Sequence, residues 1–202
     1  VTVTVEVEKI APEPINFNVS GETLQNPFFT GNYTRPRILF DGTNYHLWYR
    51  TYGGTEIVTY HKKATTVEGL KNITGTQINI VNGEKGLDNF FVIKEGDKYY
   101  LFSSDDTNIN VYTSNDGTNW TFKSKVFSND SGEAWDSLKI DNPMVIKDGT
   151  EYKLYYQGKS NSSGYRIGLA TSDTIDGTYK AVANNPILEP GTEDASWDKN
   201  AL

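Results

Sequence analysis

Apolar and polar positions recur in a fixed strand-turn-strand order along the chain. Three segments run from an apolar stretch through Asp-Gly or Glu-Gly into a tyrosine-rich stretch. These dipeptides supply the positive φ of a tight hairpin, so each segment predicts two antiparallel strands. Asp41, Glu95 and Asp148 are then turn residues. The three segments are RPRILFDGTNYHLWYR from Arg35, NFFVIKEGDKYYLFSS from Asn89 and NPMVIKDGTEYKLYYQ from Asn142.

Two more strands follow the second and third hairpins. The segments INVYTSNDGTNWTF and YRIGLATSDTIDGTYKAV each predict a third strand, an Asp-Gly turn and a fourth strand. The fourth strands carry Trp120 and Tyr179, respectively. We expect Trp48 and Trp120, which lie within predicted strands, to be core residues.

The spacing of the repeats indicates the architecture. Pro36, Phe90 and Pro143 hold the same place in successive repeats, 54 and 53 residues apart. A four-stranded unit of about 50 residues that cannot bury both faces alone is typical of a β-propeller blade. We therefore predict an all-β propeller of four-stranded antiparallel blades, with about three blades and part of another. The alternative is a β-sandwich, which does not usually repeat one motif at constant separation.

The domain boundaries follow from the same repeat. Residues 26–202 are assigned to the blades, with inner strands starting near residues 35, 89 and 142 and a further blade begun at about 195. Residues 1–25 are assigned to an N-terminal strand and a proline-containing linker, because VTVTVEVEK alternates in the manner of a half-buried strand. We expect this strand to complete another blade or to pair with a neighbouring subunit.

Composition narrows the classes of function. The net charge is −7 with a pI near 4.9, and Lys and Arg are scattered, which excludes an extended nucleic-acid surface. No apolar run approaches the about 18 residues of a membrane span. The absence of Cys excludes disulfides and thiolate catalysis. Two histidines do not make a zinc site, and Asp105-Asp106 lacks the spaced ligands of a calcium loop, so we expect no cofactor.

Localisation has one weak indicator. Six Asn-x-Ser/Thr sequons are present, which is typical of an extracellular protein or one at a cell or virion surface. They begin at Asn18, Asn32, Asn72, Asn119, Asn129 and Asn161.

Three stretches extend the comparison to a known family. PMVIKDGTEYKLYYQG, YRIGLATSDTIDGTY and NNPILEPGTEDASWD resemble blades of the five-bladed propeller clan of glycoside hydrolases that contains arabinanases, β-xylosidases, levanases and invertases. The resemblance implies a carbohydrate partner bound in an axial funnel. Because the chain holds about three repeats, it also implies that a further segment or another chain completes the ring, or that the lineage has lost blades.

The resemblance assigns catalysis to carboxylates at the starts of inner strands. The corresponding positions in this chain hold Arg35, Asn89 and Asn142, none of which can act as an acid or a base. They remain candidates for binding the sugar. Whether the chain is an enzyme is therefore left open.

Three acidic residues are the alternative catalytic candidates. Asp88 and Asp141 each lie one position before the expected site, and Glu133 is the third acid. In the functional interpretation they line the funnel and act on a glycosidic bond. In the structural interpretation the two aspartates cap the loops that lead into their blades.

Further candidates for substrate binding are basic and aromatic. Arg35 and Arg37 flank Pro36, where a guanidinium can bind a carboxylated sugar or pair with a neighbouring Asp. Trp135 and Trp197, each followed by Asp, can stack on sugar rings or pack between blades.

Two functions follow from these residues. The first is hydrolysis or binding of a polysaccharide or oligosaccharide in the axial funnel. The second is a noncatalytic glycan-binding or assembly module of a surface or virion complex. Both rest on fold analogy for the carbohydrate.

Overall fold

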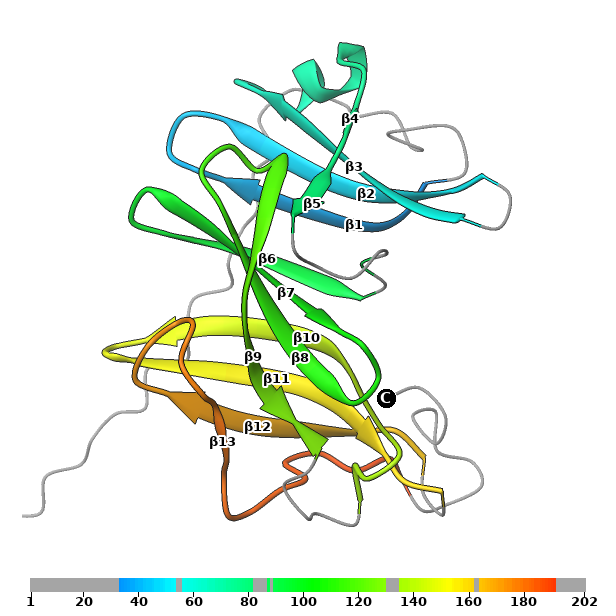
Figure 1. Ribbon diagram of the computed structural model, residues 1–202, viewed down its shortest axis with the longest axis vertical. Coiled ribbons are helices and arrows are strands. Elements are labelled where there is room, and N and C mark those ends of the chain that lie inside the picture. The colour runs from blue at the N-terminus through cyan, green and yellow to red at the C-terminus, as the bar shows by residue number, and fades with distance from the viewer. Residues whose placement is uncertain are drawn as a thin grey trace, which may run out of the picture.

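The computed structural model describes residues 33–53, 56–81, 87, 89–129, 135–161 and 164–191. These residues form three sheets that follow one another along the long axis of the molecule (Figure 1). The only helix in the described part of the chain is the 3₁₀-helix η1 (Glu68–Asn72). None of the described helical residues could form a membrane span.

Each sheet corresponds to one sequence repeat. Blade 1 contains β1 (Tyr33–Phe40), β2 (Tyr45–Gly53), β3 (Glu56–Ala64) and β4 (Thr76–Gln77), paired in this order. Blade 2 contains β5 (Asn79–Val81), β6 (Phe90–Glu95), β7 (Lys98–Ser104), β8 (Asn108–Ser114) and β9 (Asn119–Ser128), in the order β5-β9-β8-β7-β6. Blade 3 contains β10 (Lys139–Asp148), β11 (Glu151–Lys159), β12 (Arg166–Ser172) and β13 (Lys180–Ala181).

The hairpin turns form as the sequence predicts. Gly42, Gly96 and Gly149 have φ values of 99°, 59° and 63°, which an L side chain rarely adopts. Each glycine lies between the first two antiparallel strands of its repeat. The Asp-Gly and Glu-Gly pairs are therefore turn residues.

The three inner strands lie next to one another. β1 contacts β6, and β6 contacts β10, so the first strand of each repeat lies beside the first strand of the next (Figure 1). Three sheets that share an inner edge are successive propeller blades, which confirms the propeller and excludes the β-sandwich.

Aromatic cores fill the spaces between blades. Trp48 and Trp120, both fully buried, lie in the core between blades 1 and 2. A second core joins blades 2 and 3 and includes Phe102, Leu154 and Tyr156. The two tryptophans are core residues, as the sequence predicts.

Strand β5 adds a link that the repeat pattern does not predict. It pairs in parallel with β9, with Ile80 opposite Trp120. Because β5 follows β4 of blade 1 in sequence, the chain leaves blade 1 by joining the outer edge of blade 2. Blade 2 therefore has five strands instead of the expected four.

Candidate functional site

The inner strands of blades 1 and 3 begin with matching bulges. Arg35 and Asn142 have positive φ values of 53° and 48°, and the register of β1 with β2 and of β10 with β11 shifts at these points. Both residues precede a proline, and non-glycine residues in this conformation are uncommon. We name Arg35, Asn89, Asp141 and Asn142 the inner-strand entrance.

Hydrogen bonds join the entrances of neighbouring blades. Asn89 Nδ2 donates to Asp141 Oδ1 at 2.7 Å, from blade 2 to blade 3. Arg37 Nε donates to the carbonyl oxygen of Phe90 at 2.7 Å, from blade 1 to blade 2. The starts of the three inner strands therefore lie next to one another from blade to blade, as a shared axis requires.

Asp141 is buried and surrounded by donors. It is 5% exposed, and Oδ1 also accepts hydrogen bonds from Ser104 Oγ at 2.5 Å and from the backbone N–H of Asn142 at 2.8 Å. Lys139 Nζ lies 3.2 Å from Oδ2 and 2.6 Å from the exposed Asp106. One cation thus bridges two carboxylates.

The pKa of Asp141 reflects these donors. Burial alone would raise the pKa of this carboxyl, but the hydrogen bonds it accepts, led by that from Ser104, outweigh burial and lower it. The carboxylates also raise the pKa of Lys139, although burial opposes them. Both groups are charged at neutral pH.

The remaining entrance residues differ in exposure. Asn89 is 3% exposed, and its Oδ1 atom has no hydrogen-bond partner among the described residues. Asn142 Nδ2 donates to Gln157 at 2.5 Å, and Arg35 is exposed. Arg35 is therefore the entrance residue most open to solvent.

Trp135 and Asp136 pack within blade 3. The Trp135 indole, 7% exposed, stacks on Tyr156 with 5.7 Å between ring centroids and an interplanar angle of 26°. Asp136 is fully buried and accepts a hydrogen bond from the Tyr156 hydroxyl at 3.0 Å. A Cβ on Gly158 would lie 2.6 Å from both side chains. This burial favours the packing interpretation over sugar stacking.

Three candidates lie outside the described residues. They are Asp88, Glu133 and Trp197. Their catalytic and stacking roles remain predictions.

Asp105 and the described acids offer no metal centre. The Asp105 carboxylate accepts hydrogen bonds from the backbone of Thr107 and Asn108 and from the Asn110 side chain. These bonds occupy it in the β7-β8 turn. Within the described ranges, no three His, Cys, Asp or Glu residues are grouped so that they could hold a metal ion.

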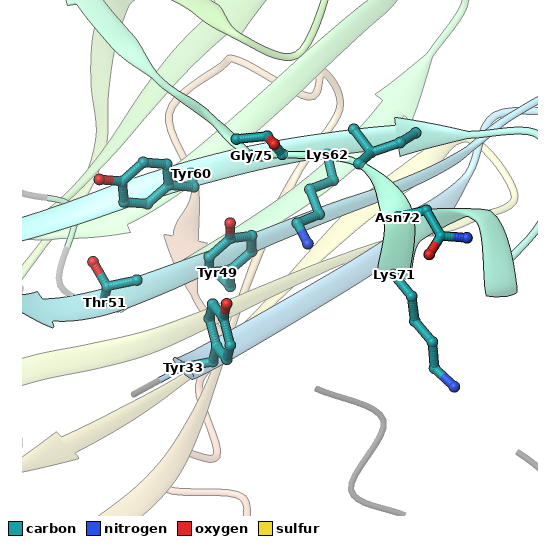
Figure 2. A pocket seen from close by; sticks show the side chains of 10 residues that line it. Tyr33, Tyr49, Thr51, Tyr60, Lys62, Lys71, Asn72 and Gly75 are labelled. Carbon is teal, nitrogen blue, oxygen red and sulfur yellow. The ribbon is translucent and has the colours of Figure 1, made fainter. Parts of the chain in front are cut away.

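A separate pocket lies on the face of blade 1 turned away from blade 2. It has a volume of about 420 Å³, and Figure 2 shows Tyr33, Tyr49 and Tyr60 with Lys62 on one side of it. The segment after η1 forms another side, with Gly75 pressed against the Tyr49 hydroxyl. Tyr49 alternates with Trp48 along β2, so the pocket and the core between blades 1 and 2 occupy opposite faces.

Comparison with protein families shows the family of the chain. The profile of glycosyl hydrolases family 43 matches residues 78–198, more than half of the sequence. The chain belongs to this family. The expected relation to the propeller clan of glycoside hydrolases is therefore confirmed. Curated proteins gave no match.

Solved structures show the same family 43 fold. The BlXynB protein from Bacillus licheniformis has a TM-score of 0.63 and 16% identity, over 82% of this chain and 32% of its own. An endo-1,4-beta-xylanase from Bacteroides thetaiotaomicron has a TM-score of 0.59 and 21% identity, over 80% and 57%. A xylan beta-1,4-xylosidase from Bacillus halodurans has a TM-score of 0.57 and 16% identity, over 77% and 31%. This chain thus spans 31–57% of these three structures.

The family 43 chain contains a buried hydrogen-bonded relay that sequence reasoning missed. His46 Nε2 lies 3.0 Å from Asp41 Oδ2, and His46 Nδ1 lies 2.9 Å from His61 Nε2. His61 Nδ1 lies 2.8 Å from Thr118 Oγ1 of blade 2. Tyr99 also donates to Asp41 Oδ2, at 2.8 Å. The alternation of β2 predicts that His46 and Trp48 share a face, but it does not reveal a partner in blade 2.

Proposed function

We propose that the described blades bind a polysaccharide or oligosaccharide at the inner-strand entrance and that Asp141 is a structural residue of this site. Membership of family 43 supports a carbohydrate ligand. The observation that carries the proposal is the alignment of Arg35, Asn89 and Asn142 at the starts of three adjacent inner strands. Guanidinium and amide groups are suitable hydrogen-bond partners for sugar hydroxyls. Arg35 is exposed and Asn142 is half-buried, so these two offer such groups, whereas the buried Asn89 positions Asp141.

The chemistry of Asp141 is unsuited to glycoside hydrolysis. A general acid needs a raised pKa, whereas the pKa of Asp141 is lowered. A nucleophile or base needs an accessible oxygen, but Oδ1 already accepts three hydrogen bonds and Oδ2 faces Lys139. The carboxylate therefore fastens blade 3 to blade 2 and orders the surrounding polar groups.

Hydrolysis is the competing function, and family membership favours it. It requires carboxylates from outside the described residues, for which Asp88 and Glu133 are the candidates. Binding and hydrolysis therefore predict different effects of substituting Asp141. Only if Asp141 is catalytic would the substitution abolish sugar release while the fold stays intact.

Gel retardation and sugar release together test the proposal. Native gels containing arabinan, xylan, fructan, mannan or a polyuronate should retard the wild-type chain. Arg35→Asn should weaken retardation because it removes the exposed guanidinium, while Asn tolerates the left-handed backbone. Lys180→Ala, at the outer edge of blade 3, is the control and should bind normally.

Two results would overturn this proposal. One is the lack of retardation by every polysaccharide. The other is release of reducing sugar that disappears in Asp141→Asn while the circular dichroism spectrum stays native, which would make Asp141 catalytic.

A further inference from the structure

We infer that the glycan bound at the inner-strand entrance is acidic and that Arg35 binds a carboxylate of one of its hexuronic acid units. This inference rests on the proposed function and specifies its ligand. The family resemblance implies a carboxylate at the start of each inner strand, but the first of these positions holds Arg35. Its permanently charged guanidinium lies in an exposed bulge.

Arg35 and Arg37 have no acidic partner in the described part of the chain. Among the described residues, no carboxylate forms an ion pair with either guanidinium. Arg37 instead donates to the carbonyl oxygens of Phe90 and Pro36, at 2.7 and 3.0 Å. A carbonyl accepts the hydrogen bond but does not neutralise the charge.

The charge of Arg35 also acts on Arg37. Burial lowers the pKa of Arg37, and the charge of Arg35 lowers it further. The groups therefore lie close enough to repel, and the fold maintains this arrangement without a described counterion. A bound anion would relieve the repulsion and favour binding at this point.

Lys139, the cation on the blade 3 side of the entrance, already has carboxylate partners. Lys139 bridges Asp106 and Asp141, so its charge is neutralised within the protein. Of Arg35, Arg37 and Lys139, only the two arginines of blade 1 are left without a carboxylate partner among the described residues. In a chain of net charge −7, an acidic polymer is repelled in general and has a specific point of attachment here.

The bulge explains how Arg35 can perform this role. Its φ of 53° and the following Pro36 interrupt the register of β1, which frees Arg35 from the alternation of the strand. Arg37 is fixed by Phe90 and supplies a second charge behind it. A guanidinium can donate two parallel hydrogen bonds to a carboxylate, whereas a lysine offers only a point charge.

The test compares acidic polymers with their neutral counterparts. Dissociation constants of the full chain would be measured for polygalacturonate and alginate and for the same polymers after reduction of their carboxyl groups. Wild type should bind at least one polyuronate, with affinity about 10- to 100-fold lower after carboxyl reduction, the range expected for losing hydrogen bonds between charged groups.

The variants separate the guanidinium from charge alone. Arg35→Asn should lower polyuronate affinity by about the same 10- to 100-fold and leave affinity for the reduced polymer unchanged. Arg35→Lys should recover only part of the loss because it restores charge without the two-donor geometry. Lys180→Ala, which also removes one positive charge, should match wild type if non-specific attraction is unimportant.

The remaining outcomes overturn one proposal or both. Equal binding of acidic and reduced polymers, or binding of neutral polysaccharides alone, overturns the acidic-glycan inference and leaves the proposed function standing. Full recovery by Arg35→Lys or an equal loss in Lys180→Ala overturns the specific role of Arg35. Failure to bind any polysaccharide overturns both proposals.

Discussion

At the scale of single residues, the relay from Thr118 to Asp41 has one consistent proton arrangement at neutral pH. Asp41 accepts from His46 Nε2–H, so neutral His46 must accept at Nδ1 from His61 Nε2–H. His61 Nδ1 then accepts from the Thr118 hydroxyl. The bond between the two rings requires one nitrogen to lack a proton, so the fold opposes simultaneous protonation of both histidines.

This arrangement predicts loss of stability in mild acid. Burial, followed by the charge of His46, lowers the pKa of His61 from 6.5 to about 3, and burial also lowers that of His46. The unfolded chain binds these protons first, so the contribution of each buried neutral histidine is full above pH 6.5. For His61 it falls by up to about 1.4 kcal/mol per pH unit toward pH 3.

Urea denaturation of wild type and His61→Gln between pH 7 and pH 4 measures this effect. The variant should show a shallower dependence of unfolding free energy on pH, because its unfolded chain no longer binds a proton at position 61. Lys180→Ala should retain the wild-type slope. Parallel curves for wild type and His61→Gln would contradict the buried neutral state of His61.

Asp141 predicts a larger effect at neutral pH. Asp141→Asn removes a buried charge that accepts from Asn89 and faces Lys139, and should lower the unfolding free energy by about 3 kcal/mol. Asp106→Asn removes the other, exposed partner of Lys139 and should cost less than about 1 kcal/mol. Equal urea midpoints for the two variants would argue against Asp141 as a structural link.

At the scale of elements, two glycine turns with similar backbones have different surroundings. Gly117 has a φ of 78°, and a Cβ there would lie 3.0 Å from Trp48 Cζ2 and 3.1 Å from His61 Cε1. Gly149 has a φ of 63°, with nothing within 4 Å of such a Cβ. Gly117 also accepts a hydrogen bond from Trp48 Nε1, at 2.8 Å, so its turn is part of the contact between blades 1 and 2.

Alanine substitutions should separate backbone strain from crowding. Gly149→Ala should lose about 1–2 kcal/mol of unfolding free energy through the left-handed backbone alone. Gly117→Ala should lose about 1–3 kcal/mol more, because the added methyl crowds Trp48 and His61. The check is urea denaturation of both variants, and equal losses would show that the space between the blades adapts freely.

The elements differ in how readily they follow from sequence. The hairpin turns are predictable because Asp-Gly and Glu-Gly act locally, and Trp48 is predictable as core from its strand. The bulges at Arg35 and Asn142 are harder to predict from the sequence, since residues before proline usually adopt extended conformations. The burial of Asp141 depends on Asn89, which is 52 residues away and in another blade.

At the scale of the whole molecule, the three blades follow one another with their inner strands adjacent, and the polar entrance lies where these strands begin. The regular repeat spacing predicts this arrangement because each blade must bury its faces against a neighbour. Ile38 and Phe40, 59% and 54% exposed, alternate with Arg37 and Leu39 on β1 and lie on the face away from blade 2. We expect a further segment or another chain to complete the ring.

Two separate surfaces of the molecule offer groups that can bind a sugar. The entrance offers a guanidinium and amides at the inner edge. The pocket of Tyr33, Tyr49 and Tyr60 offers aromatic rings on the outer face of blade 1 (Figure 2). The entrance lies where hydrogen bonds join neighbouring blades, whereas the pocket is lined by residues of blade 1 alone, and we assign the sugar to the entrance.

A crystal structure of the chain with an oligosaccharide from a polysaccharide that it retains tests this assignment most directly. We expect sugar density at the starts of β1, β6 and β10, with a sugar oxygen within hydrogen-bonding distance of the Arg35 guanidinium. Sugar bound in the tyrosine pocket with the entrance empty would contradict it.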